Sequence, residues 1–165
     1  MNLYIVRHAE AEALGGGIDS DFNRPLTTRG KSDAQLMAQA VHHVDARIRH
    51  IFTSPLLRAV ETGEIFGKEL KRSPETSRWL SPGFSPSALA ETILSQSNDA
   101  GVMVIGHQPD MSIFIAHLIS PVCAATVDMV TCAVACLEVE GDNSAHLRWL
   151  MTPDMVGKMS VVSPR

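Results

Sequence analysis

Short apolar runs, each stopped by polar residues, divide this chain into expected strands and helices. The clearest runs cover residues 3–6 and 102–105, and such continuous apolar character is typical of parallel strands buried on both faces. Residues 48–53 form another short β-like run. Apolar positions three or four residues apart predict helices over about 28–45, from Ser54 and Pro55 through Phe66, over 87–95 and over 111–119. Ser54 suits an N-cap and Pro55 the first helical position.

The last third of the chain has a different pattern. Two alternating runs, over 133–139 and 145–151, flank a turn-like stretch at 140–143 and predict an antiparallel hairpin. A Ser- and Pro-rich loop at 73–86 is expected to hold a short strand near 78–80. These elements together predict an α/β fold, a three-layer α/β/α sandwich with a mostly parallel central sheet and an antiparallel C-terminal edge.

Length and composition narrow the class of protein. The 165 residues suit one domain, 1–165, with a loose tail at 152–165, and the 45% hydrophobic content predicts a compact fold. A net charge of -4 argues against a nucleic-acid-binding protein. No apolar stretch approaches the roughly 20 residues that span a membrane, and the first run stops at Arg7, so we expect a cytoplasmic protein. Nothing in the sequence indicates an oligomeric state.

The cysteines and a glycine triplet could suggest a metal or cofactor site, but each lacks the other residues of the corresponding motif. Cys123, Cys132 and Cys136 include no Cys-x-x-Cys pair and no nearby histidine, so we interpret them as structural thiols. The triplet at 15–17 is not followed by the Lys-Ser/Thr of a nucleotide-binding loop. We therefore expect neither a cofactor nor a metal.

Candidate chemistry gathers where the expected parallel strands end. Arg7 and His8 follow the first strand, Arg58 lies about one turn inside the helix after the second, and His107 follows the strand at 102–105. The carboxyl ends of parallel strands share one edge of a sheet, so these residues predict a cationic pocket in an acidic protein. Guanidinium groups bind phosphoryl oxygens bidentately, and a neutral imidazole held through its other nitrogen by a backbone carbonyl is a nucleophile. His8 is the candidate nucleophile.

The motifs around these residues resemble a known family. The run from Val6 to Glu10 is similar to the Arg-His-Gly motif of the histidine phosphatase superfamily, also called the phosphoglycerate mutase-like superfamily. The segment at 24–27 before Arg29-Gly30, and the turn at 107–109, resemble the SixA-type phosphohistidine phosphatases within it. This resemblance implies that His8 is phosphorylated and that Arg7, Arg58 and His107 bind the phosphoryl group.

The sequence departs from the family pattern at two places. Ala9 replaces the motif glycine, a change of one methyl group that we expect the fold to tolerate. Many members that cleave phosphate esters carry a mid-chain carboxylate as general acid, whereas residues 72–85 contain only Glu75 and the next acid is Glu91. A phosphohistidine releases an imidazole with a pKa of about 6.5, so it depends less on such an acid than an ester does.

The sequence therefore predicts a metal-independent phosphatase that acts on a phosphohistidine-bearing phosphotransfer protein. A phosphatase for small phosphate esters, a non-catalytic phosphoprotein-binding module, and a metal site of His8 and His107 with Glu10 or Asp110 remain alternatives. Glu10, the carboxylate nearest to His8 in the sequence, could act as a general acid, orient a ring, bind substrate or form a surface ion pair. Arg24 and Arg29 could contact substrate, but we expect them to pair with acids that lie nearby in the sequence, namely Asp19, Asp21 or Asp33.

Overall fold

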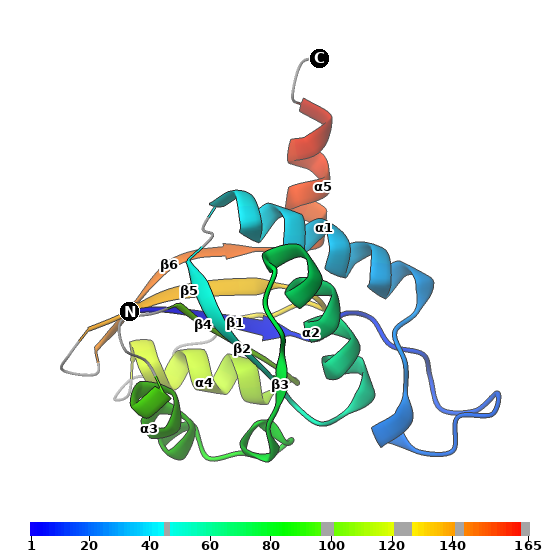
Figure 1. The fold of residues 1–165 in the computed structure, drawn as a ribbon, viewed down its shortest axis with the longest axis horizontal. Coiled ribbons are helices and arrows are strands. Elements are labelled where there is room, and N and C mark those ends of the chain that lie inside the picture. Colours follow the sequence, from blue (N-terminus) through cyan, green and yellow to red (C-terminus); the bar gives the residue numbers. More distant parts are fainter. Residues whose placement is uncertain (45–46, 97–100, 121–126, 141–143, 163–165) are drawn as a thin grey trace.

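The computed structural model describes residues 1–44, 47–96, 101–120, 127–140 and 144–162. Six strands form one sheet in the order β3-β2-β4-β1-β5-β6 (Figure 1). The strands are β1 (Asn2–Arg7), β2 (Ile48–Thr53), β3 (Glu75–Thr76), β4 (Gly101–Gly106), β5 (Val134–Val139) and β6 (Ala145–Met151). Strands β3, β2, β4 and β1 are parallel, and β5 pairs antiparallel with both β1 and β6. The mostly parallel sheet with an antiparallel C-terminal edge is as predicted.

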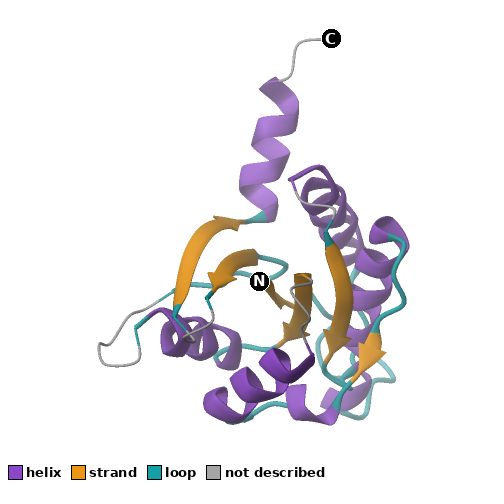
Figure 2. Ribbon diagram, turned by 60° about the vertical axis from the view of Figure 1, so that its left-hand side comes forward, coloured by secondary structure: helices purple, strands orange, loops and turns teal. Residues whose placement is uncertain are grey.

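Helices cover both faces of the sheet, which lies between them in Figure 2. The helices are α1 (Thr28–Val44), α2 (Leu57–Leu70), α3 (Pro86–Gln96), α4 (Asp110–Ile119) and α5 (Pro153–Val162), with 3₁₀ turns η1 (Asp21–Asn23) and η2 (Arg78–Leu80). One apolar cluster joins the sheet to α3 and α4, and a second joins it to α1, α2 and α5. This is the predicted α/β/α sandwich.

Strand β1 shows why its sequence is a continuous apolar run. Leu3 and Ile5 belong to the cluster beneath α3 and α4, whereas Tyr4 and Val6 belong to the cluster beneath α1 and α2. Because successive side chains of a strand point to opposite faces, a central strand of a covered sheet needs apolar residues at both parities. The apolar run ends where the helices no longer cover the strand, and the polar residues that follow lie at the carboxyl end of the strand.

The tail at 152–165 contains a helix, α5 (Pro153–Val162), which begins beside α1, where Val156 is buried, and then extends away from the sheet (Figure 1). Two sequence expectations need correction. The short strand in the 73–86 loop is Glu75–Thr76, which pairs with β2, while 78–80 is a 3₁₀ turn. Helix α2 begins at Leu57, not at Ser54 and Pro55.

Some expectations concern residues outside the described ranges. These are the end of the first helix at Asp45, Cys123, the turn residues 141–143 and the tail residues 163–165. Within the described ranges, no helix combines the length and the apolar character that crossing a membrane requires.

Candidate active site

The carboxyl ends of β1 and β4 lie side by side and carry the two candidate histidines. The His8 amide donates to the Gly106 carbonyl at 2.9 Å, and the His8 carbonyl accepts from the Cys132 amide at 3.1 Å. The backbone of His8 is therefore held from both sides, by β4 and by the segment before β5. His107 follows Gly106 directly, and its ring centroid lies 5.1 Å from that of His8.

Hydrogen bonds to its two ring nitrogens define the state of His8. Nδ1 lies 2.7 Å from the Ala9 carbonyl oxygen, which can only accept, so Nδ1 carries the proton in the neutral ring. Nε2 then holds the lone pair and accepts from Nε of Arg58 at 3.2 Å. The backbone carbonyl that the sequence argument required is present, and Nε2 is the nitrogen that faces Arg58.

Arg58 reaches the site because it is the second residue of α2 and its side chain returns toward the start of the helix. It is a buried cation, with 6% of its surface exposed. Thr62, one turn later and fully buried, donates from Oγ1 to the Arg58 carbonyl at 2.7 Å and accepts from the Ala9 amide at 3.1 Å. The start of α2 is thereby tied to the residue that follows His8.

Two buried nitrogens of the site lack a hydrogen-bond partner among the described residues. One is Nε of Arg7, whose NH1 donates to the Met129 carbonyl at 2.8 Å, and the other is Nδ1 of His107. A buried donor without a partner costs about 1–3 kcal/mol, so such groups in a native fold call for an explanation. An anion bound beside Arg7 and His107 would satisfy both.

Ser54 was predicted as a helix N-cap, but its hydroxyl has another partner. Ser54 Oγ lies 2.7 Å from Nε2 of His107, and both residues are buried. If the hydroxyl donates, Nε2 is the acceptor nitrogen and the unpartnered Nδ1 carries the proton. The position of Ser54 directly after a strand could have indicated a place in the site. The Ser-Pro pattern indicates a helix start instead.

Burial keeps the two imidazoles neutral. It lowers the pKa of His8 to about 4, helped by the cations of Arg58 and Arg7, although the bond to the Ala9 carbonyl acts in the opposite direction. It also lowers the pKa of His107 to about 3, with further lowering from His8 and Arg58. A neutral His8 keeps the lone pair that a nucleophile needs.

The carboxylate at the site is Asp21, which the sequence argument considered only as an ion-pair partner of Arg24 or Arg29. Asp21 pairs with Arg24 as expected, at 2.9 Å, but its other oxygen lies 3.1 Å from NH2 of Arg58. Arg24, mainly, and Arg58 hold the pKa of Asp21 below its usual range. No periodicity links residues 21 and 58, so the sequence alone carried no signal for this pair.

Glu10 lies apart from this cluster. Its carboxylate is 3.8 Å from Nε of Arg29, which also lies 3.7 Å from Asp33, and the Arg29 side chain is exposed. The structure thus brings Arg7, His8, Arg58 and His107 together and places the side chain of Glu10 in a surface ion pair. Ala9 is fully buried, so the fold accommodates the methyl group that replaces the motif glycine.

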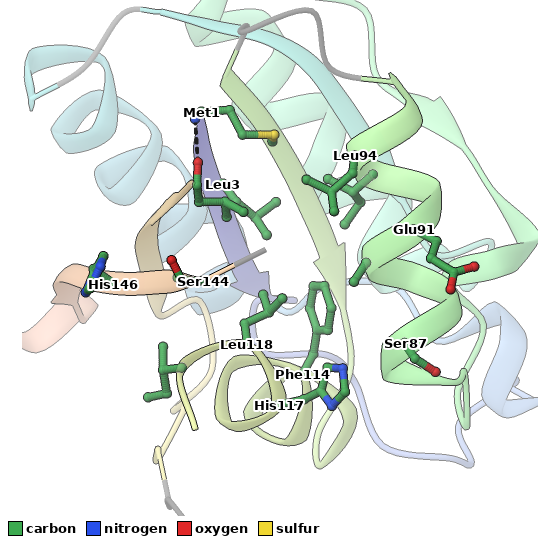
Figure 3. Close-up of a pocket in the computed structure, with 15 residues that line it drawn as sticks. Met1, Leu3, Ser87, Glu91, Leu94, Phe114, His117, Leu118, Ser144 and His146 are labelled. Carbon is green, nitrogen blue, oxygen red and sulfur yellow. Dashed lines mark hydrogen bonds between the residues drawn. The ribbon is translucent and has the colours of Figure 1, made fainter. Parts of the chain in front are cut away.

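Two further features concern ligands. Among the described residues, no group of three His, Cys, Asp or Glu side chains could hold a metal ion. A cavity of about 590 Å³ lies at the other end of β1, under α3 and α4, where Met1, Leu3, Phe114 and His117 line it (Figure 3). None of Arg7, His8, Arg58 and His107 lines this cavity.

Comparison with known proteins identifies the family. A sequence profile of the histidine phosphatase superfamily (branch 1) matches residues 3–81. The phosphohistidine phosphatase SixA of Escherichia coli (strain K12) is 30% identical over 159 residues, which cover 93% of this chain and 94% of that protein. The chain belongs to the histidine phosphatase superfamily.

Solved structures agree with this assignment. The protein histidine phosphatase SixA complexed with tungstate superposes with a TM-score of 0.85 at 29% identity, covering 94% of this chain and 99% of the other. A mycobacterial glucosyl-3-phosphoglycerate phosphatase complexed with VO3 shares the fold, with a TM-score of 0.69 at 16% identity, covering 90% and 97%. Membership of the histidine phosphatase superfamily supports a phosphatase activity for this chain.

Proposed function

We propose that this protein is a phosphohistidine phosphatase that works through a phosphorylated His8. The observation that carries the proposal is the orientation of His8, whose Nδ1 is held by the Ala9 carbonyl while Nε2 faces Arg58. A neutral, tautomerically defined imidazole beside a buried guanidinium is suited to attack a phosphoryl group. The similarity to SixA over nearly the whole chain supports the same activity.

The reaction has two steps, each of which exchanges one bond to phosphorus. Nε2 of His8 attacks the phosphorus, and the bond between phosphorus and the substrate imidazole breaks. The substrate ring, which carries a proton on its other nitrogen, leaves with the bonding electron pair as a neutral imidazole. Water then attacks phospho-His8, the bond to Nε2 breaks, and orthophosphate leaves while Nε2 regains its lone pair. Arg7, Arg58 and His107 donate N–H groups to the phosphoryl oxygens, whose charge is spread over the transition state.

The state of Asp21 favours a phosphohistidine over a phosphate ester. An ester releases an alkoxide that needs a proton, whereas the carboxylate in contact with Arg58 is ionised, with a lowered pKa, and has no proton to give. Glu75 on β3 and Glu91 on α3 are exposed, and neither is hydrogen-bonded to the His8 ring. This site therefore suits an imidazole leaving group better than an alkoxide. The similarity to SixA supports a phosphohistidine that is part of a protein.

Small phosphate esters are the second candidate substrate class. The structural neighbour that acts on glucosyl-3-phosphoglycerate has the same fold, so the fold alone does not distinguish the substrates. Initial rates on a phosphohistidine-bearing phosphotransfer protein and on a panel of sugar phosphates separate the two. We expect the phosphoprotein to have the higher kcat/KM, and a higher value for any sugar phosphate would overturn that substrate assignment.

The covalent step has a direct test. Rapid acid-free quenching followed by intact mass measurement should detect a phosphoenzyme in the wild type and none in His8→Ala, which should also lose turnover. His117→Ala is the matched control, because His117 is exposed on α4 and lies outside the site. Undiminished turnover in His8→Ala would refute the mechanism, and binding of phosphoprotein without any turnover would instead indicate a binding module.

A further inference from the structure

Asp21 holds the outer end of the Arg58 guanidinium. NH1 of Arg58 donates to the Asp21 backbone carbonyl at 2.7 Å, and NH2 donates to the Asp21 carboxylate at 3.1 Å. Nε of Arg58 is left for His8. One residue thus engages both terminal nitrogens through its main chain and its side chain, which defines the plane and the rotation of the guanidinium.

These contacts leave donors for a substrate. A guanidinium has five N–H groups in a planar fork, and the three recorded contacts use one on each nitrogen. The second N–H on each terminal nitrogen makes no hydrogen bond within the part of the chain that the structure describes, and Nε–H faces the nitrogen that receives the phosphoryl group. Asp21 therefore does not need to leave Arg58 for a phosphoryl oxygen to be bound.

Asp21 is itself held in place from several directions. NH1 of Arg24 lies 2.9 Å from its other carboxylate oxygen, and Ser20 caps the turn η1 by accepting from the Phe22 amide at 3.2 Å. The ends of this loop are tied to each other between Ala11 and Leu26, and the Leu26 amide donates to Glu61 on α2 at 2.6 Å. The segment after β1 extends past the end of the sheet in Figure 1, yet it returns to the helix that carries Arg58.

We propose that Asp21, oriented by Arg24, is a positioning residue that holds the Arg58 guanidinium in the geometry required for phosphoryl transfer. This inference rests on the proposed function of the site and adds the loop at 20–24 to it. A long arginine side chain that is free to rotate would lose entropy on binding the transition state, and preorganisation removes that cost. The opposite role is also testable, namely that Asp21 occupies the place of the substrate anion and obstructs it.

The experiment compares Asp21→Ala, Asp21→Asn and Asp19→Ala with the wild type. Asp19 is an exposed carboxylate in the same loop and is not hydrogen-bonded or ion-paired to Arg58, so its loss controls for the change in charge. The readouts are kcat and KM on phosphohistidine protein, the Kd of tungstate by calorimetry, and the thermal midpoint. Asp21→Asn keeps an oxygen acceptor and similar size, so it remains informative if Asp21→Ala fails to fold.

We expect Asp21→Ala to lower kcat roughly 10- to 100-fold and to weaken tungstate binding, with Asp21→Asn in between and Asp19→Ala unchanged. Tighter tungstate binding in Asp21→Ala would show that Asp21 obstructs the site and would overturn the proposal. Unchanged kcat and unchanged tungstate affinity would overturn it as well. Absent turnover in the wild type would count against the proposed function alone, because tungstate affinity tests the positioning of Arg58 without any reaction.

Discussion

At the scale of single residues, the site depends on which nitrogen of each histidine carries a proton. The Ala9 carbonyl, which can only accept, defines this for His8, and in His107 Nδ1 carries the proton if the Ser54 hydroxyl donates to Nε2. Both rings are neutral because burial and neighbouring cations lower their pKa values to about 4 and about 3. The same type of side chain thus serves as the nucleophile at His8 and as a hydrogen-bond donor at His107, because the two rings have different hydrogen-bond partners.

The lowered pKa of His8 predicts how the site responds to acid. Protonation of Nε2 removes the lone pair, so the nucleophile is lost as the pH falls through about 4 and is fully present at higher pH. The folded-state pKa of His8 lies below the ordinary value of about 6.5, so protonation also favours the unfolded state. The free energy of unfolding therefore decreases as the pH is lowered from about 6.5 to about 4. NMR titration of the imidazole C–H signals, assigned with His8→Ala, checks the pKa. A value near 6.5 would contradict this account.

Ser54 gives a second prediction at this scale. Ser54→Ala removes the partner of His107 Nε2, so the ring is free to adopt the other tautomer and Nδ1 no longer presents a fixed N–H. We expect kcat to fall about tenfold and stability by about 1 kcal/mol. Steady-state kinetics and denaturant unfolding measure the two effects. Ser87→Ala on the surface of α3 is the control. Equal kcat values for the two variants would show that Ser54 does not contribute to the site.

At the scale of elements, close contacts between backbones bring the junctions together. Gly30, near the start of α1, lies so close to the main chain of Glu10 that a Cβ atom would collide with the Glu10 carbonyl oxygen. Thr27 also donates from its amide to that carbonyl, at 3.0 Å. The start of α1 therefore packs directly on the segment that follows His8.

A matched pair of glycine substitutions tests this contact. Gly30→Ala should destabilise the fold by about 1–3 kcal/mol and reduce turnover, because the obstacle is backbone two residues from His8. Gly157→Ala in α5 has Leu36 Cδ2 at 4.0 Å as its nearest atom, so it should be neutral or stabilising by up to about 1 kcal/mol. Thermal unfolding and kcat of both variants provide the measurement. Equal stability of the two variants would contradict the close approach.

At the scale of the whole molecule, the sheet gathers positive charge in an acidic chain. The protein carries a net charge of -4, yet Arg7 and Arg58 converge where β1 and β2 end, beside His107. These groups supply the donors and the charge that a metal ion supplies in other phosphoryl-transfer sites. We therefore propose that the reaction proceeds without a divalent cation.

Chelation tests that conclusion for the whole enzyme. Turnover of phosphohistidine protein should be unchanged after dialysis against EDTA, because the proposed steps involve only side chains of this chain and water. The rate is measured before and after dialysis, and again after Mg²⁺ or Zn²⁺ is restored. A loss of activity that metal reverses would refute metal independence and revive a site that includes His8 and His107.

Much of this architecture was predictable from the sequence because it depends on local patterns. Continuous apolar runs indicated the buried strands, and the residues that stopped them indicated which side chains lie at the sheet edge. The order of elements then predicted the sandwich, and Arg7, His8, Arg58 and His107 followed from the parallel direction of the strands. The motif resemblance pointed to the same four residues.

Only the tertiary structure decided the contacts between segments that share no period. Ser54 matched the pattern of an N-cap, but its buried hydroxyl is hydrogen-bonded to His107. Asp21 and Arg58 are 37 residues apart, and Val156 is anchored by packing against the cluster beneath α1. Side-chain partners across loops depend on packing and desolvation, which a one-dimensional pattern does not encode, whereas strands and their ends depend on periodicity, which it does.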